Sequence, residues 1–169
     1  MTSSDADLAV IGAQLGRTPR GVAKVAWRCP AGRPGVVVTA PRLPDGTPFP
    51  TTYYLTCPRA VAACSKLEAT GLMASMNERL TSDDALRAAH RAAHDAYVAD
   101  RAALSVVLGV ADVPKTGASA GGMPDRVKCL HALVGHALAS GPGVNPLGDE
   151  ALAAAGAFWQ PCVAGDPCA

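Results

Sequence analysis

This sequence has few aromatic residues and no excess of either charge. Its 169 residues include only two Phe, two Trp and three Tyr, too few for the stacking platform on which proteins bind sugars or bases. Fifteen basic residues stand against fourteen acidic ones, which gives a formal net charge of +1. Nucleic acids and anionic membranes favour partners with a basic excess. The composition therefore argues against both as partners.

Long apolar runs and targeting signals are also missing. The longest apolar run, 102–111, is about half as long as a membrane span and is interrupted by Ser105. The N-terminus carries neither a basic region nor an apolar secretory core. We therefore expect a cytoplasmic protein. In that compartment its six cysteines are more readily reduced, metal-bound or catalytic than paired in disulfides.

Apolar residues, by contrast, are abundant. They make up 49% of the chain, which is enough for one buried core in a protein of this length. We expect a single domain over residues 1–156. The stretch 157–169 is rich in Pro, Gly and Ala, and we expect it to form a loosely ordered tail.

Hydrophobic periodicity and turn residues predict strands first and helices afterwards. Strands are expected over 21–28, 36–39 and 51–56, the first two forming a hairpin. Helices are expected at 4–16, from 58 to about 80 with a break at Gly71, at 83–108, at 124–140, and in a short stretch capped by Asp149. This order predicts an α+β fold: a small three-stranded antiparallel sheet packed by about five helices, with a helix-rich C-terminal half.

Two motifs that would identify a cofactor are absent. The sequence has no Cys-x-x-Cys pair and no Gly-Lys-Ser/Thr of a phosphate-binding loop. The glycine-rich stretch 141–149 ends in Asp149, whose carboxylate would repel phosphate, so we interpret it as a structural loop. Any chemistry must therefore come from residues that folding brings together.

Three cysteines occupy positions from which they could reach a shared site. Cys29 lies in the turn after the first strand, and Cys57 directly precedes a helix, where amide groups favour a thiolate. Cys129 lies on the helix expected from residue 124. Three such thiolates could hold zinc with a fourth ligand, or an iron–sulfur cluster with one open iron. Each could instead fill the core as a small hydrophobe, the interpretation that we adopt for Cys64.

The neighbours of Cys129 suggest a role for that helix. In a helix that starts at residue 124, Asp125 and Arg126 would lie one turn before Cys129 and share its face. Arg126 would stabilise a thiolate, and Asp125 could ligate a metal or orient a substrate. The candidate catalytic residues are therefore Asp125, Arg126 and Lys128, and the additional candidate metal ligands are His131 and Cys162.

His90 and His94 form a pair at helical spacing. Residues four apart lie on one helix face, as in helical zinc sites. No Glu intervenes, and the charged residues Arg87, Arg91 and Asp95 alternate with the pair. We therefore interpret this part of the helix as a solvated face, on whose exposed side Arg101 also lies.

Several unusual sequence blocks resemble a known family. They are RCP at 28–30, APRLPDGTPFPT at 40–51, YYLTCP at 53–58, GMPDRVKCLH at 122–131 and GPGVNPLGDE at 141–150. Together they resemble the actinobacterial family catalogued as domain of unknown function 501, over about residues 8 to 155. The resemblance implies a bacterial cytoplasmic protein encoded near enolase and a septum-formation initiator, and it implies no known activity.

Three functions compete at this point. The first is a metal-binding protein, with Cys29, Cys57 and Cys129 as ligands to zinc or an iron–sulfur cluster and an open position for a small anionic substrate. The second is a non-enzymatic protein that binds another protein in cell division, which depends on the gene neighbourhood alone. The third is a metal-free thiol enzyme with Cys57 or Cys129 as the nucleophile.

Overall fold

The computed structural model describes residues 3–112 and 119–156 and contains one three-stranded sheet. Strands β1 (Val22–Arg28), β2 (Pro34–Thr39) and β3 (Tyr53–Leu55) pair antiparallel in that order. All six residues of the central strand β2 are buried. A strand buried on both faces needs a cover on each side of the sheet, and two helices provide it.

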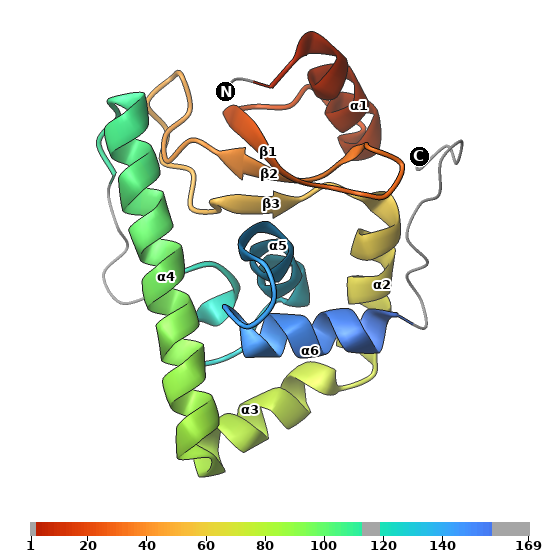
Figure 1. The fold of residues 1–169 in the computed structure, drawn as a ribbon, viewed down its shortest axis with the longest axis vertical. Helices are drawn as coiled ribbons and strands as arrows, with labels where there is room; N and C mark the ends of the chain where they lie inside the picture. Colours follow the sequence, from red (N-terminus) through yellow and green to blue (C-terminus); the bar gives the residue numbers. More distant parts are fainter. Residues whose placement is uncertain (1–2, 113–118, 157–169) are drawn as a thin grey trace.

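Helix α1 (Asp5–Leu15) covers one face and α5 (Leu130–Ser140) the other (Figure 1). The side chain and backbone of Ser4 form a capping box with Asp7, which starts α1 where the sequence predicts it. Gly135 allows α5 to approach the sheet closely, because a Cβ there would lie 3.1 Å from the carbonyl oxygen of Tyr53. The sheet is therefore sandwiched between the first helix and a much later one.

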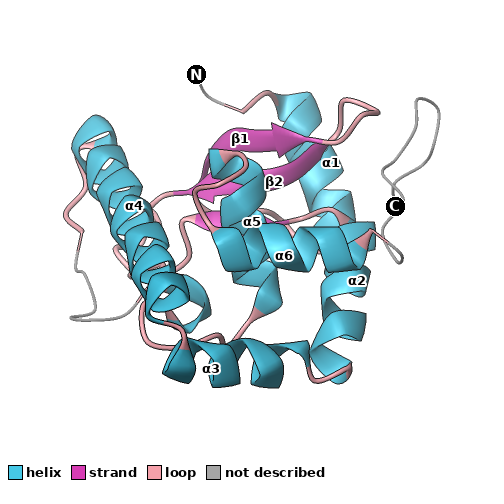
Figure 2. Cartoon of the chain, turned by 60° about the horizontal axis from the view of Figure 1, so that its bottom comes forward, coloured by secondary structure: helices cyan, strands magenta, loops and turns pink. Residues whose placement is uncertain are grey.

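Three consecutive helices form a frame around α5 and α6 (Pro146–Ala155) (Figures 1 and 2). They are α2 (Pro58–Ala69), α3 (Leu72–Ser82) and α4 (Asp84–Leu108). A short 3-10 turn, η1 (Ala120–Gly122), precedes α5. The predicted break is confirmed, because Gly71 adopts a φ of +84° between α2 and α3.

The predicted α+β class is confirmed. The described residues contain six α-helices where the sequence predicts about five, because the break at Gly71 separates two complete helices. Asp149 does not cap the last helix. Asn145 does so by accepting from the Gly148 N–H, while Asp149 accepts from the Gly143 N–H. Within the described parts of the chain, no helix combines the length and apolar character that crossing a bilayer requires. The predicted tail, 157–169, lies outside the described residues.

The helix predicted over 124–140 begins six residues later, at Leu130. The segment before it is held by side chains and backbone from elsewhere: Asn77 donates to the Val127 carbonyl at 2.9 Å and accepts from the Val127 N–H at 2.8 Å. The Lys128 N–H donates back to Gly121. These partners replace the helical ones, so Pro124 is not the start of the helix.

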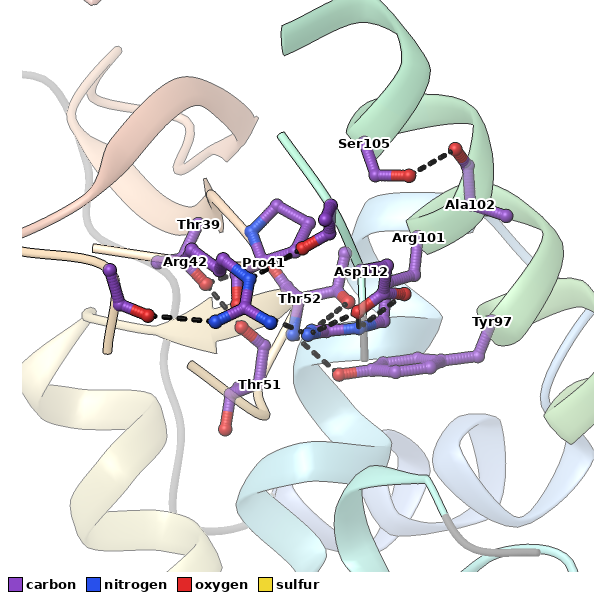
Figure 3. Close-up of polar contacts among 12 residues, drawn as sticks. Thr39, Pro41, Arg42, Thr51, Thr52, Tyr97, Arg101, Ala102, Ser105 and Asp112 are labelled. Carbon is purple, nitrogen blue, oxygen red and sulfur yellow. Dashed lines mark hydrogen bonds and ion pairs between the residues drawn. The ribbon is translucent and has the colours of Figure 1, made fainter. Parts of the chain in front are cut away.

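The sequence predicts Arg101 on the exposed side of α4, and this prediction is wrong. Its side chain is almost buried and pairs with Asp112 at 3.0 Å, with further contacts to Thr52 and to the carbonyl of Pro41 (Figure 3). A buried guanidinium requires a carboxylate partner, and the chain supplies it just after the end of α4. These contacts fasten α4 to the loop between β2 and β3.

Candidate metal centre

Three side chains converge where the end of α2 meets the start of α5. Cys129 is the residue directly before α5, His131 lies in the first turn of α5, and Glu68 lies in the last turn of α2. One ligand atom from each lies within 4.8 Å of the other two. Among the described residues, no other group of three His, Cys, Asp or Glu side chains comes this close.

Glu68 joins the two helices. Its Oε1 accepts from the Leu130 N–H at 2.8 Å and contacts His131 Nδ1 at 3.1 Å. The first amide groups of a helix lack helical partners and carry the positive end of its dipole. The Glu68 carboxylate therefore caps α5 and also fixes the position of His131.

The two ring nitrogens of His131 face different partners. Nε2 lies 3.2 Å from the carbonyl oxygen of Val61 and 3.4 Å from Ser65 Oγ. Because the carbonyl can only accept, Nε2 carries a hydrogen. Nδ1 faces Glu68 Oε1 at 3.1 Å and Cys129 Sγ at 3.8 Å. The Glu68 carboxylate and the Cys129 thiol, both acceptors when ionised, thus lie close to the same nitrogen of His131.

The charges of Cys129, His131 and Glu68 influence one another. The hydrogen bond with Cys129 is the largest cause that raises the pKa of His131 to about 9, against the opposing effect of burial, and the Glu68 carboxylate adds to it. Burial on its own would raise the pKa of Cys129, but the hydrogen bond from His131 and the Ala132 amide outweigh it, so this pKa is lowered. In the metal-free chain the pair is therefore biased towards thiolate and imidazolium.

Cys64 lies beside this cluster without joining it. Its side chain is buried in the core, as predicted, and burial is the main cause that raises its pKa to about 12, with smaller contributions from Glu68 and Cys129. A thiol with so high a pKa stays protonated and binds metal poorly. The environment thus keeps the Cys64 thiol protonated and favours the thiolate at the neighbouring Cys129.

Comparison with known proteins places the chain in a family. The family model described as a protein of unknown function, DUF501, matches residues 25–153, which is most of the sequence. The chain belongs to the DUF501 family. No curated protein and no solved structure matches it. The three cluster residues all lie within the matched region of this DUF501 protein.

The DUF501 fold brings together two of the predicted ligands, Cys129 and His131, and leaves two others apart from them. Cys29 is buried in the turn after β1, packed against Trp27 and Ala31. Cys57 is only 1% exposed, where it precedes α2 and contributes to the main core. In the part of the chain that the structure describes, neither belongs to a group of three ligands. Cys162 lies outside the described residues.

The predicted catalytic residues of the DUF501 chain lie on the segment that precedes α5. Asp125, Arg126 and Lys128 are exposed there, and because α5 starts at Leu130, Asp125 and Arg126 do not occupy a helical turn behind Cys129. The helix start predicted after Cys57 is found, since Cys57 directly precedes α2, and Cys129 directly precedes α5 in the same way. The basic neighbour of the thiol is His131 in place of Arg126.

Sequence reasoning missed Glu68. One signal was available: an acidic residue in the last turn of a helix faces the negative end of the helix dipole, which is unfavourable. Such a placement indicates a specific partner. In this DUF501 structure the partner is the positive end of α5, although no spacing in the sequence points to it.

Proposed function

We propose that this DUF501 protein binds one zinc ion through Cys129 Sγ, His131 Nδ1 and the Glu68 carboxylate. The observation that supports this most is the crowding of a thiol and a carboxylate around one imidazole nitrogen. A metal cation between the three atoms would satisfy all of them at once. The other nitrogen faces a backbone carbonyl, as is usual for a histidine that ligates a metal.

The donor set favours zinc over an iron–sulfur cluster. Iron–sulfur clusters are held mainly by several cysteine sulfurs, and this group offers one. A mixture of sulfur, nitrogen and carboxylate oxygen is typical of zinc sites. The earlier alternative of a cluster held by Cys29, Cys57 and Cys129 has no such convergence to support it.

Three protein ligands leave one tetrahedral position for a water molecule or substrate. Zinc centres of this kind polarise a bound group or activate water, whereas structural sites use four protein ligands. The side chains of His131 and Glu68 are each about one quarter exposed, so solvent reaches the cluster. Arg126 and Lys128 are exposed on the segment that precedes α5, and their positive charge suits a small anionic substrate.

Metal analysis of untagged protein tests this proposal. We expect one equivalent of zinc per chain that depends on Cys129, and after exchange for cobalt a sulfur-to-metal charge-transfer band. Cys129→Ala and His131→Ala should each weaken binding by at least about 100-fold, because each removes a direct ligand. Binding would be measured by competition with a chromophoric chelator.

Cys64→Ala is the matched control. It removes a thiol from the same region but from a position assigned to packing, so zinc content should equal that of the parent. Circular dichroism confirms that each variant folds. A zinc content equal to that of the parent in folded Cys129→Ala protein, or zinc loss in folded Cys64→Ala protein, would contradict the assignment.

The lowered pKa and the half-buried position of Cys129 favour thiol chemistry as a second candidate function. In metal-free protein, iodoacetamide should alkylate Cys129 at pH 7 faster than free cysteine, because His131 favours the thiolate. His131→Gln should slow this reaction, and added zinc should block it only if the metal proposal holds. A rate equal to that of free cysteine would exclude an activated thiol.

A further inference from the structure

His90 and His94 on α4 do not lie on a solvated face, contrary to the prediction from the sequence. His90 is 1% exposed and belongs to the inner surface of α4, together with Ala93 and Tyr97. His94, one turn further along, is partly buried. Figure 1 shows the segment that leads into α5 beside this stretch of α4.

The buried nitrogens of this pair have no side-chain partners among the described residues. No side chain bonds to either ring nitrogen of His90, on which only the backbone of Arg126 acts as an acceptor, and the enclosed Nδ1 of His94 has no partner. His131 has partners on both nitrogens, and His136 has Asn145 on Nδ1 and none on Nε2. An enclosed polar atom without a partner costs about 1–3 kcal/mol. The open nitrogens of these two adjacent histidines are therefore available to a ligand.

A carboxylate lies on the same side of the molecule. Asp125 is exposed on the segment before α5, and its charge acts on His90. The two hydrogen bonds between Asn77 and Val127 hold that segment in place. An exposed side chain on a fixed backbone can turn towards a cation without disturbing the core.

We propose that His90 and His94, completed by Asp125, form a second metal site that binds a divalent transition metal such as zinc. Histidines four residues apart on a helix present their nitrogens to one ion, and imidazole with carboxylate suits zinc, nickel and cobalt. Burial is the main cause that lowers the pKa of His90, so its ring is neutral and able to ligate at pH 7. The site contains no sulfur and is independent of the cluster at Cys129.

Cobalt titration of the full untagged chain separates the two sites. All proteins carry Cys162→Ser and Cys168→Ser, so that the thiols of the tail do not contribute. We expect two equivalents of cobalt to bind, and His94→Ala to reduce this to one while the sulfur-to-cobalt band stays. His94 is chosen because it is less buried than His90. Asp95→Ala, a change at an exposed residue next to it, should keep both equivalents.

Cys129→Ala in the same background gives the complementary result. We expect it to keep one equivalent and lose the charge-transfer band, and the added change His94→Ala should then remove metal binding. If folded Cys129→Ala protein binds no cobalt, or if His94→Ala leaves the stoichiometry unchanged, the second site does not exist. One equivalent without a sulfur band in the parent protein would instead remove the proposed zinc centre and keep this site.

Discussion

Glu68 shows how a single side chain can serve two structural elements. Its carboxylate accepts from the first amide of α5 and contacts His131 on the same oxygen. The charge is unfavourable at the end of its own helix, α2, and favourable at the start of α5. The residue therefore contributes only when the two helices are docked.

Glu68→Gln tests the charge at nearly constant volume. The amide oxygen can still accept from Leu130, but the negative charge that helps to hold the His131 proton is lost. We expect the pKa of His131 in metal-free protein to fall from about 9 and zinc affinity to drop at least about tenfold. NMR titration of the histidine ring and chelator competition measure the two effects. Glu78→Gln, on the exposed side of α3, should change neither.

At the scale of elements, the close packing of α5 depends on glycine. A Cβ at Gly148 on α6 would lie 2.5 Å from the carbonyl oxygen of Leu133 on α5, closer than real atoms approach. Because that contact is with backbone, a shift of the whole helix would be needed to relieve it. The two glycines, Gly135 and Gly148, therefore set how closely the sheet, α5 and α6 stack.

Gly148→Ala should lower the free energy of unfolding by about 2 kcal/mol or more, the typical cost of overpacking. Gly12→Ala on α1 is the matched control, since its Cβ would meet its nearest neighbour at 3.5 Å, an ordinary contact. There the change should stabilise the protein by about 0.5 kcal/mol, because alanine favours the helix. Urea denaturation of both variants checks the opposite signs. Equal effects in the two variants would contradict the packing argument.

At the scale of the whole molecule, the core contains a polar centre. His136 is fully buried, stacks on Tyr53 with 5.5 Å between ring centroids, and meets the edge of Tyr97 at 5.3 Å. Asn145 donates to its Nδ1 and also caps α6. This centre joins the sheet, α4, α5 and α6, so the charge state of one imidazole affects the packing of all four.

The stability of metal-free protein should therefore depend on pH with a maximum near pH 6.5. Burial lowers the pKa of His136 to about 4, so its stabilising contribution, up to about 3 kcal/mol, is complete above pH 6.5 and is lost as the pH falls through 4. Burial also lowers the pKa of His90, so its contribution to stability is likewise lost at acid pH. The raised pKa of His131, about 9, adds stability below pH 6.5 that is lost as the pH rises through 9.

Urea midpoints between pH 4 and pH 9.5 measure this profile. His136→Gln should flatten the acid side, and His131→Gln should flatten the alkaline side, each without removing the other slope. A profile that is flat in the parent protein between pH 4.5 and 6.5 would show that His136 titrates normally.

Local signals predicted the elements of this fold, and the site depends on partners that no local signal reveals. The Ser4 cap, the break at Gly71 and the cap of α4 by Asp83, whose carboxylate accepts from the Leu86 N–H, act within a few residues, and the structure contains all three. Asn77 acts on Val127 across 50 positions, which is why the helix expected from Pro124 starts at Leu130. Because the helix starts later than predicted, the basic side chain beside the Cys129 thiol is His131 and not Arg126.

The sandwich of the sheet between α1 and α5 also has a consequence for synthesis on the ribosome. The helix that covers this face of β3, α5, lies far downstream in the chain, so the face stays uncovered until α5 has been synthesised. At roughly 5 to 20 residues per second, the about eighty residues between Tyr53 and Gly135 take on the order of 4 to 16 seconds to translate. During that interval the nascent sheet exposes an apolar surface, and chains that terminate before residue 130 should aggregate or require a chaperone.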